Sequence, residues 1–202
     1  MLARILALLL SCLPVCAFSQ NGAYSRQNDL NLTRDSQKVS VWSGVSPDSP
    51  DGGFLGKTKD KMFVILGVRY GKVVAAGRRM ALEYTFDAFP VAEVIDRNSK
   101  DSVYGFGLSP VGLKWYVLQV SRFKLFTNGS GGFLTFVEDV PDPDARKFNF
   151  TFEFGGGIEV FTNSRVGIAL GYRYHHLSNA NTEKVNPGLD ANIFYIGISR
   201  FF

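Results

Sequence analysis

Residues 147–161, KFNFTFEFGGGIEVF, alternate between two kinds of side chain with a period of two. Phenylalanines fall on one face of an extended segment and polar residues on the other: Phe148, Phe150, Phe152 and Phe154 against Asn149, Thr151 and Glu153. Because side chains alternate strictly along a strand, the pattern predicts a β-strand. A soluble sandwich also alternates, but consecutive outward phenylalanines opposite a polar face are typical of a barrel wall between lipid and a polar lumen.

The same period recurs along the chain, which has 18 Phe, 8 Tyr and 21 Gly. It predicts strands at 38–45, 61–71, 78–87, 103–119, 123–136, 147–161, 165–177 and 190–202. A break is expected in the fourth strand at Pro110, since proline donates no ladder hydrogen bond. Residues 38–202 are therefore expected to form an eight-stranded antiparallel transmembrane β-barrel of the outer-membrane type. A soluble β-sandwich is the alternative.

The expected connections alternate between long and short, as they do when short turns face the periplasm and long loops face outside. KVVAAGR, VSR and TNS are the short ones, and SPDSPDGGFLGKTKD and SNANTEKVNPGL are among the long ones. Both ends of the barrel then lie at its periplasmic rim. The terminal aromatic Phe202 resembles the signal read by the outer-membrane assembly machinery, so that machinery is an expected partner.

The first residues predict export. Residues 1–19 combine a short basic start, an apolar core and Ala17-Phe18-Ser19 as a cleavage site, which is the pattern of a signal peptide. The apolar run is shorter than the roughly 20 residues of a spanning helix, and a lipoprotein signal ending at Cys12 is a weaker alternative. Residues 20–37 are polar without a period and are expected to be a flexible N-terminal segment.

The positions of the cysteines and the net charge limit the kinds of metal site and binding partner that the chain can have. Cys12 and Cys16 both lie in the leader, which excludes a disulfide framework and thiolate metal sites in the mature chain. Without Arg4 the chain has 21 basic and 18 acidic residues, a balance too mild to indicate nucleic acid. No metal and no cofactor is expected, and the sequence leaves both monomer and homodimer open.

Three polar residues in or just beyond the last two expected strands fall at the alternating positions whose side chains face lipid. His176 and Ser178 follow the outward set of strand 165–177, and Asp190 shares the parity of Phe194 in the last strand. A hairpin pairing 176 with 190 keeps both outward sets in register and makes His176 and Asp190 cross-strand neighbours. His175 has the opposite parity and should point inward.

A base between a nucleophile and an orienting acid is the order that acyl transfer requires. Counted from residue 165, a strand of about 9–11 residues brings His176 to the outer interface. Polar groups on a lipid-facing wall are costly unless something polar meets them, which indicates the ester-bearing boundary of a membrane lipid. Ordinary interface residues that end a strand are the alternative reading.

The stretch HLSNA, followed by NPG and then an acid, resembles the lipid A 3-O-deacylase (PagL-type) family of outer-membrane acyl hydrolases. Weaker similarity runs through GFGLSPVGLKWY, GGFLTFVEDVP and FNFTFEFGGGIEV. The resemblance implies His176 as general base, Ser178 as nucleophile and lipid A of the Gram-negative outer leaflet as substrate. It also implies that Asn179 and Asn186 shape the site or its oxyanion hole.

Asp190 departs from the glutamate that the resemblance implies and is one methylene shorter. The hairpin must then bring it closer, or a water must bridge to the histidine, or the enzyme is slow. A calcium-dependent outer-membrane phospholipase is an enzymatic rival, and a non-catalytic barrel with a structural or adhesion role is the second function class. Basic residues of the expected outer loops are candidates for meeting lipid phosphates, or form a solvated loop face: Lys57, Lys59, Lys61, Arg97, Lys100, Arg146 and Lys184.

Overall fold

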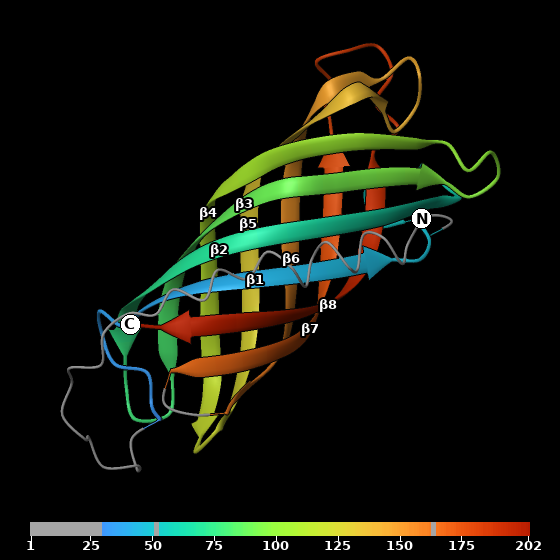
Figure 1. Ribbon diagram of the computed structural model, residues 1–202. Helices are drawn as coiled ribbons and strands as arrows, with labels where there is room; N and C mark the ends of the chain where they lie inside the picture. The colour runs from blue at the N-terminus through green and yellow to red at the C-terminus, as the bar shows by residue number, and fades with distance from the viewer. Residues whose placement is uncertain (1–29, 51–52, 163–164) are drawn as a thin grey trace.

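The computed structural model describes residues 30–50, 53–162 and 165–202, and within them the chain is a closed barrel of eight antiparallel strands (Figure 1). Each strand pairs with its neighbours in sequence, and β1 pairs with β8 to close the wall. The strands are β1 (Gln37–Ser46), β2 (Lys61–Ala76), β3 (Ala81–Asp96), β4 (Ser102–Val120), β5 (Phe123–Val140), β6 (Arg146–Phe161), β7 (Val166–Ser178) and β8 (Leu189–Phe201). In the described part of the chain, no helix is long and apolar enough to cross a membrane.

All eight expected strands are present, and the fold class is confirmed. The expected end of the third strand at residue 87 is wrong, because β3 continues to Asp96. Phe89 and Val94 are buried in the lumen, while Pro90 is exposed. A register shift between Phe89 and Ala92 lets the ladder to β4 pass this proline. The segment after residue 87, which we expected to be a loop, is therefore part of a strand.

The expected break at Pro110 is also wrong, since β4 runs through it. The ladders on both sides change register there, between Thr85 and Asp87 on the β3 side and between Leu108 and Val111 on the β5 side. Such a bulge leaves an extra residue outside the hydrogen-bonded ladder, so proline costs no paired donor. The proline therefore does not interrupt the strand.

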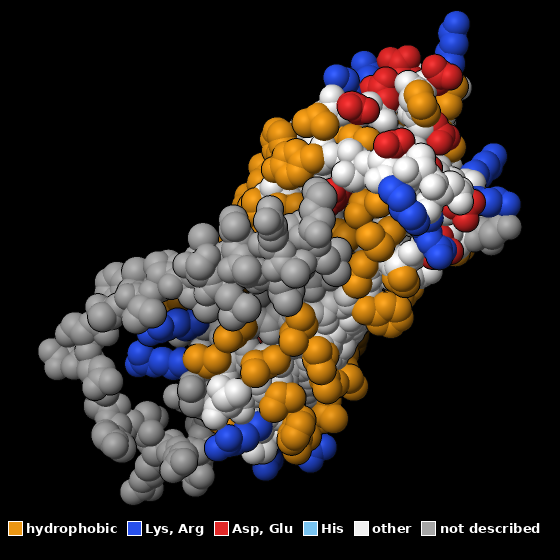
Figure 2. Space-filling view, turned by 45° about the vertical axis from the view of Figure 1, so that its right-hand side comes forward, with side chains coloured by type: hydrophobic (Ala, Val, Ile, Leu, Met, Phe, Trp, Pro, Cys, Tyr) orange, Lys and Arg blue, Asp and Glu red, His pale blue; other side chains and the backbone are white. Residues whose placement is uncertain are grey.

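The outer surface of the barrel is apolar. The four phenylalanines of β6 are 40–50% exposed, whereas Asn149 and Glu153 between them are fully buried, which confirms the predicted parity. Hydrophobic side chains lie over the body of the barrel in Figure 2, and charged side chains gather toward its two ends. This distribution suits a wall that meets hydrocarbon around its middle and water at both rims.

The lumen is filled with side chains and carries buried ion pairs. Lys38 Nζ lies 2.9 Å from Glu83 Oε2, and Lys114 Nζ lies 2.8 Å from Glu159 Oε2. The hydroxyls of Tyr116 and Ser199 donate to Glu159 at 2.8 and 2.6 Å. Buried charges are tolerated only when paired and hydrogen-bonded, and these partners meet that requirement inside the barrel.

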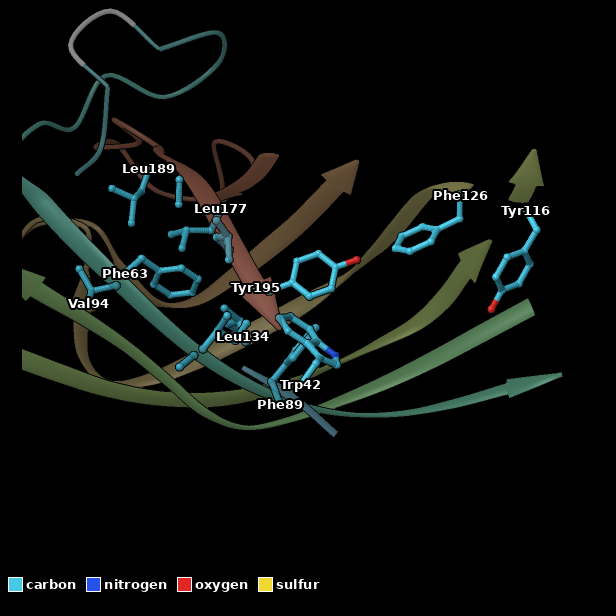
Figure 3. Close-up of a cluster of buried hydrophobic side chains, with 14 of the residues drawn as sticks. Trp42, Phe63, Phe89, Val94, Tyr116, Phe126, Leu134, Leu177, Leu189 and Tyr195 are labelled. Carbon is cyan, nitrogen blue, oxygen red and sulfur yellow. The ribbon is translucent and has the colours of Figure 1, made fainter. Parts of the chain in front are cut away.

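Toward the end with the longer loops, which we call the outer end, the lumen contains a cluster of buried apolar side chains. In Figure 3, Phe63, Val94, Leu177 and Leu189 gather at one end of the cluster, and Tyr116 lies at the other. Leu177 and Leu189 are fully buried and face each other across the β7–β8 ladder. Their burial fixes the outer end of this hairpin. The residues next to them in sequence therefore point out of the barrel.

The short-turn end is held by residues that precede β1. Most of the expected signal peptide and flexible segment, residues 1–29, lies outside the described residues. Residues 30–36 lie among the described residues, and Leu32 is buried there, with its amide donating to Gln119 Oε1 at 3.0 Å. The amide of Phe202 donates to Gln37 O at 3.0 Å. The chain end therefore lies beside the start of β1, at the short-turn end as predicted.

Candidate active site

The register of the last hairpin decides where the three predicted polar residues point. His176 pairs with Asp190, and Leu177 pairs with Leu189. Because the two leucines fill the lumen, the alternation of the strands places His176 and Asp190 on the outer wall. His175 is fully buried on the inner face. The predicted pairing and both predicted orientations are confirmed.

His176 and Asp190 are in direct contact. Nδ1 of the imidazole lies 2.7 Å from Oδ1 of the carboxylate. The side chain of His176 is 14% exposed and that of Asp190 only 1%. The shorter acid therefore reaches the ring without a bridging water, because directly opposite residues bring their Cβ atoms close. With Asp190 ionised, Nδ1 carries the proton and Nε2 is the ring nitrogen left to accept one.

Ser178 lies on the same outward face, two residues beyond His176 and at the last position of β7. It is half-buried. Across the neighbouring ladder Ser178 pairs with Phe150 and His176 pairs with Phe152. His176 and Ser178 therefore lie beside the exposed phenylalanines of β6, at a boundary between polar and apolar side chains on the outer surface.

Asn179 and Asn186 bind each other in the β7–β8 loop. The amide of Asn179 donates to Asn186 Oδ1 at 3.1 Å, and Asn179 Nδ2 donates to the carbonyl of Val185 at 2.8 Å. Asn186 Nδ2 donates to Asn181 Oδ1 at 2.9 Å. Both side-chain amides are thus engaged within the loop. Of the two implied roles, this arrangement favours shaping the loop over donating to an oxyanion.

The first outer loop is a part of the site that sequence reasoning missed. Its Leu55 amide donates to Asp190 Oδ2 at 2.9 Å. Further along, the amides of Lys57 and Thr58 donate to the carbonyls of Pro187 and Gly188 at 2.7 and 3.2 Å. The loop therefore covers Asp190, which explains why an outward carboxylate is buried. The glycine-rich DGGFLG was the one sequence signal of a close backbone approach.

Gly188 shapes the space around the imidazole. Its φ is +63°, and a Cβ at this position would lie 3.0 Å from Cε1 of His176. A side chain here would be strained by the backbone and would press on the ring. Glycine at the end of NPG therefore leaves the room in which His176 sits.

Some of the basic residues considered for phosphate binding are paired with acids. Lys61 Nζ lies 2.8 Å from Asp96 Oδ2, and Arg97 lies 2.6 Å from Asp48 Oδ2. Arg146 is 3.5 Å from Glu183. These pairs join neighbouring outer loops, which favours the solvated loop face at these positions.

A model of the lipid A 3-O-deacylase (PagL) family matches residues 67–199, a segment that contains β7, the β7–β8 loop and β8 as far as Ser199, but not the first outer loop. Among solved structures, the outer membrane enzyme PagL is similar to this chain with a TM-score of 0.63 at 16% identity, covering 78% of this chain and 97% of that one. Neisserial surface protein A follows with 0.52 at 12%, covering 82% and 97%. OprG from Pseudomonas aeruginosa gives 0.50 at 11%, covering 86% and 98%.

A search of curated proteins found no match. The solved structures share the barrel at identities that speak for the fold alone, whereas the family model extends over most of the chain and includes His176, Ser178 and Asp190. The chain belongs to the lipid A 3-O-deacylase (PagL) family and folds as an outer-membrane β-barrel.

Proposed function

We propose that the protein is an outer-membrane esterase that removes an ester-linked fatty acyl chain, the 3-O chain, from lipid A. Ser178 is the nucleophile, His176 the general base and Asp190 the acid that orients the imidazole. The observation that carries the proposal is the 2.7 Å contact between His176 and Asp190 on the outward face that also bears Ser178. Family membership supports the substrate class.

The outward direction suits a substrate that is itself a membrane component. Leu177 and Leu189 are buried in the lumen directly behind the polar pair, so a substrate reaches Ser178 from the wall and not from the interior. The exposed Phe150 and Phe152 stand in the neighbouring strand. They offer an apolar surface along which an acyl chain can lie while its ester reaches the hydroxyl.

In the first step, Ser178 Oγ attacks the ester carbonyl carbon as His176 Nε2 takes the hydroxyl proton. The imidazolium that forms keeps its Nδ1 proton on Asp190, whose charge stabilises it. The tetrahedral intermediate then collapses with cleavage of the bond to the sugar oxygen. That oxygen takes the proton from Nε2, which leaves deacylated lipid A and an acyl group on Ser178.

In the second step, Nε2 takes a proton from water, and the water oxygen attacks the acyl-serine carbonyl. Collapse returns the proton to Ser178 Oγ and releases the fatty acid. The His176 imidazolium forms only along the reaction path. The fixed Asp190 carboxylate therefore stabilises the transition states and intermediates more than the ground state.

Delivery to the outer membrane completes the proposal. Residues 1–19 act as a signal peptide, and Phe202, directly after β8, serves recognition by the assembly machinery. The side chain of Phe202 is 69% exposed, so it is accessible for such recognition.

The test is mass spectrometry of purified lipid A after incubation with the refolded protein, run beside Ser178→Ala and His176→Ala. We expect the parent to remove one hydroxyacyl mass, assigned to the 3-O position by fragmentation, and both variants to remove none. His175→Ala is the matched control because it changes the neighbouring histidine on the inner face. A folded parent that leaves lipid A unchanged would contradict the proposal and favour a non-catalytic barrel.

A further inference from the structure

Both oxygens of the Asp190 carboxylate are in contact with other parts of the protein. Oδ1 contacts His176 Nδ1 at 2.7 Å, and Oδ2 accepts a hydrogen bond from the amide of Leu55 at 2.9 Å. The first contact comes from the neighbouring strand, 14 residues away, and the second from the first outer loop, 135 residues away. The acid is therefore fixed between the last hairpin and the first outer loop.

The loop lies so close to Asp190 that only glycine fits at two of its positions. A Cβ on Gly53 would be 2.4 Å from Asp190 Oδ2, and a Cβ on Gly56 would be 2.7 Å from the amide nitrogen of Asp190. Such distances are below van der Waals contact, so the backbone of the loop itself forms the wall of the carboxylate pocket. The bonds from Lys57 and Thr58 to the β7–β8 loop hold this wall in place.

Aspartate depends on this close backbone wall more than the longer glutamate would. Aspartate cannot extend past the loop, and an ionised carboxylate buried to 1% exposure needs donors on both oxygens. We infer that residues 53–58 are a positioning element of the active site, in which the amide of Leu55 fixes Asp190 and, through it, the imidazole of His176. The inference rests on the proposed esterase function.

Removing the Leu55 amide should lower kcat and leave KM nearly unchanged, because the donor acts on the base and does not touch the substrate. A hydrogen bond to a charged group of this kind corresponds to a loss of about ten- to a hundredfold. Leu55→Pro removes the amide proton, whereas Leu55→Ala keeps it and removes only the side chain. We expect the large loss of kcat in the proline variant alone.

A second pair of variants checks the same point without proline. Gly56→Ala places a methyl group against Asp190, while Gly77→Ala places one in a turn where the nearest atom, Met80 O, is 3.8 Å away. The first should lower kcat and the second should not. Equal kcat in Gly56→Ala and Gly77→Ala would overturn the inference, as would equal losses in Leu55→Pro and Leu55→Ala.

A double-mutant cycle separates positioning from general damage to the fold. If the Leu55 amide acts through Asp190, Leu55→Pro should cost little further activity in an Asp190→Ala background. A full additional loss in that background would mean that the loop acts by another route, and it would overturn the inference.

The contact itself can be measured without any turnover. Lys57 is exposed, and we expect Asp190→Ala to speed tryptic cleavage after Lys57 in the folded barrel, whereas Ser178→Ala should not. Equal cleavage rates would show that Asp190 does not hold the loop and would overturn the inference. An inactive parent whose loop is nevertheless released by Asp190→Ala would instead contradict the proposed function and leave the contact established.

Discussion

The imidazole of His176 meets the carboxylate of Asp190 across one rung of the β7–β8 ladder, with Nδ1 2.7 Å from Oδ1. The pair lies on the outer wall of the barrel, although Asp190 is buried by the first outer loop. A carboxylate on this face is costly in hydrocarbon. Its burial under a loop and its place beside Ser178 both suit a reactive group that works on membrane lipid.

Gly188→Ala should impair the site without unfolding the barrel. The substitution strains a backbone with φ of +63° and brings a methyl group to 3.0 Å from His176 Cε1. A displacement of the ring by a fraction of an ångström to one ångström costs up to about a hundredfold in rate. Steady-state deacylation should show this loss, with Gly77→Ala as the control. An unchanged rate in Gly188→Ala would mean that the ring has room to move.

Asp190→Glu should lower activity, although glutamate is the residue that the family resemblance implies. The added methylene has to displace the loop, since Gly53 and Gly56 leave no free space beside the carboxylate. Overpacking of this kind corresponds to roughly a tenfold loss or more. Asp190→Asn keeps the size and loses the charge, and we expect a drop on the order of 10⁴ in kcat. A glutamate variant as active as the parent would contradict the tight fit.

Glu159→Ala should destabilise the barrel. The carboxylate is 1% exposed and accepts from Lys114, Tyr116 and Ser199, so its loss leaves buried charge uncompensated at a cost of about 3–5 kcal/mol. Glu183→Ala removes a partner of an ion pair on the surface, at 3.5 Å from Arg146, and should cost within about 1 kcal/mol. Urea unfolding in lipid vesicles, followed by tryptophan fluorescence, distinguishes the two, and equal midpoints would refute a stabilising lumen network.

Ile196→Lys should weaken insertion into a bilayer. Ile196 lies near the middle of β8, faces outward and is 56% exposed, so it meets the hydrocarbon core. A lysine at such depth costs about 2–4 kcal/mol. Val185→Lys, in the β7–β8 loop, changes an apolar residue outside the wall and should have little effect. Folding yield into vesicles measures both, and equal yields would place Ile196 outside the lipid.

The wall of the barrel could be predicted from sequence because its signal is local. The parity of Phe148 to Phe154 and of the outward residues of β7 follows from neighbours two positions apart, and it fixed the pairing of His176 with Asp190. The expected end of the third strand at residue 87 and the expected break at Pro110 were wrong. Register shifts in the ladders let β3 continue past Pro90 and β4 past Pro110.

The first outer loop could not be predicted in this way. The bond from Leu55 to Asp190 joins residues 135 positions apart, and no periodicity in either segment reports on the other. The burial of Asp190 was missed for the same reason, since parity gives the direction of a side chain and not what covers it. The role of Asn179 and Asn186 depends likewise on bonds inside an irregular loop.

The central claim is that His176, held by Asp190, activates Ser178 on the outer wall. The measurement that tests it most directly is labelling of the folded protein with a serine-directed fluorophosphonate, with the modified residue mapped by peptide mass spectrometry. We expect label on Ser178 in the parent, and its loss in His176→Ala although Ser178 is still present. Label on another residue, no label on the parent, or equal labelling of Ser178 in His176→Ala would contradict the claim.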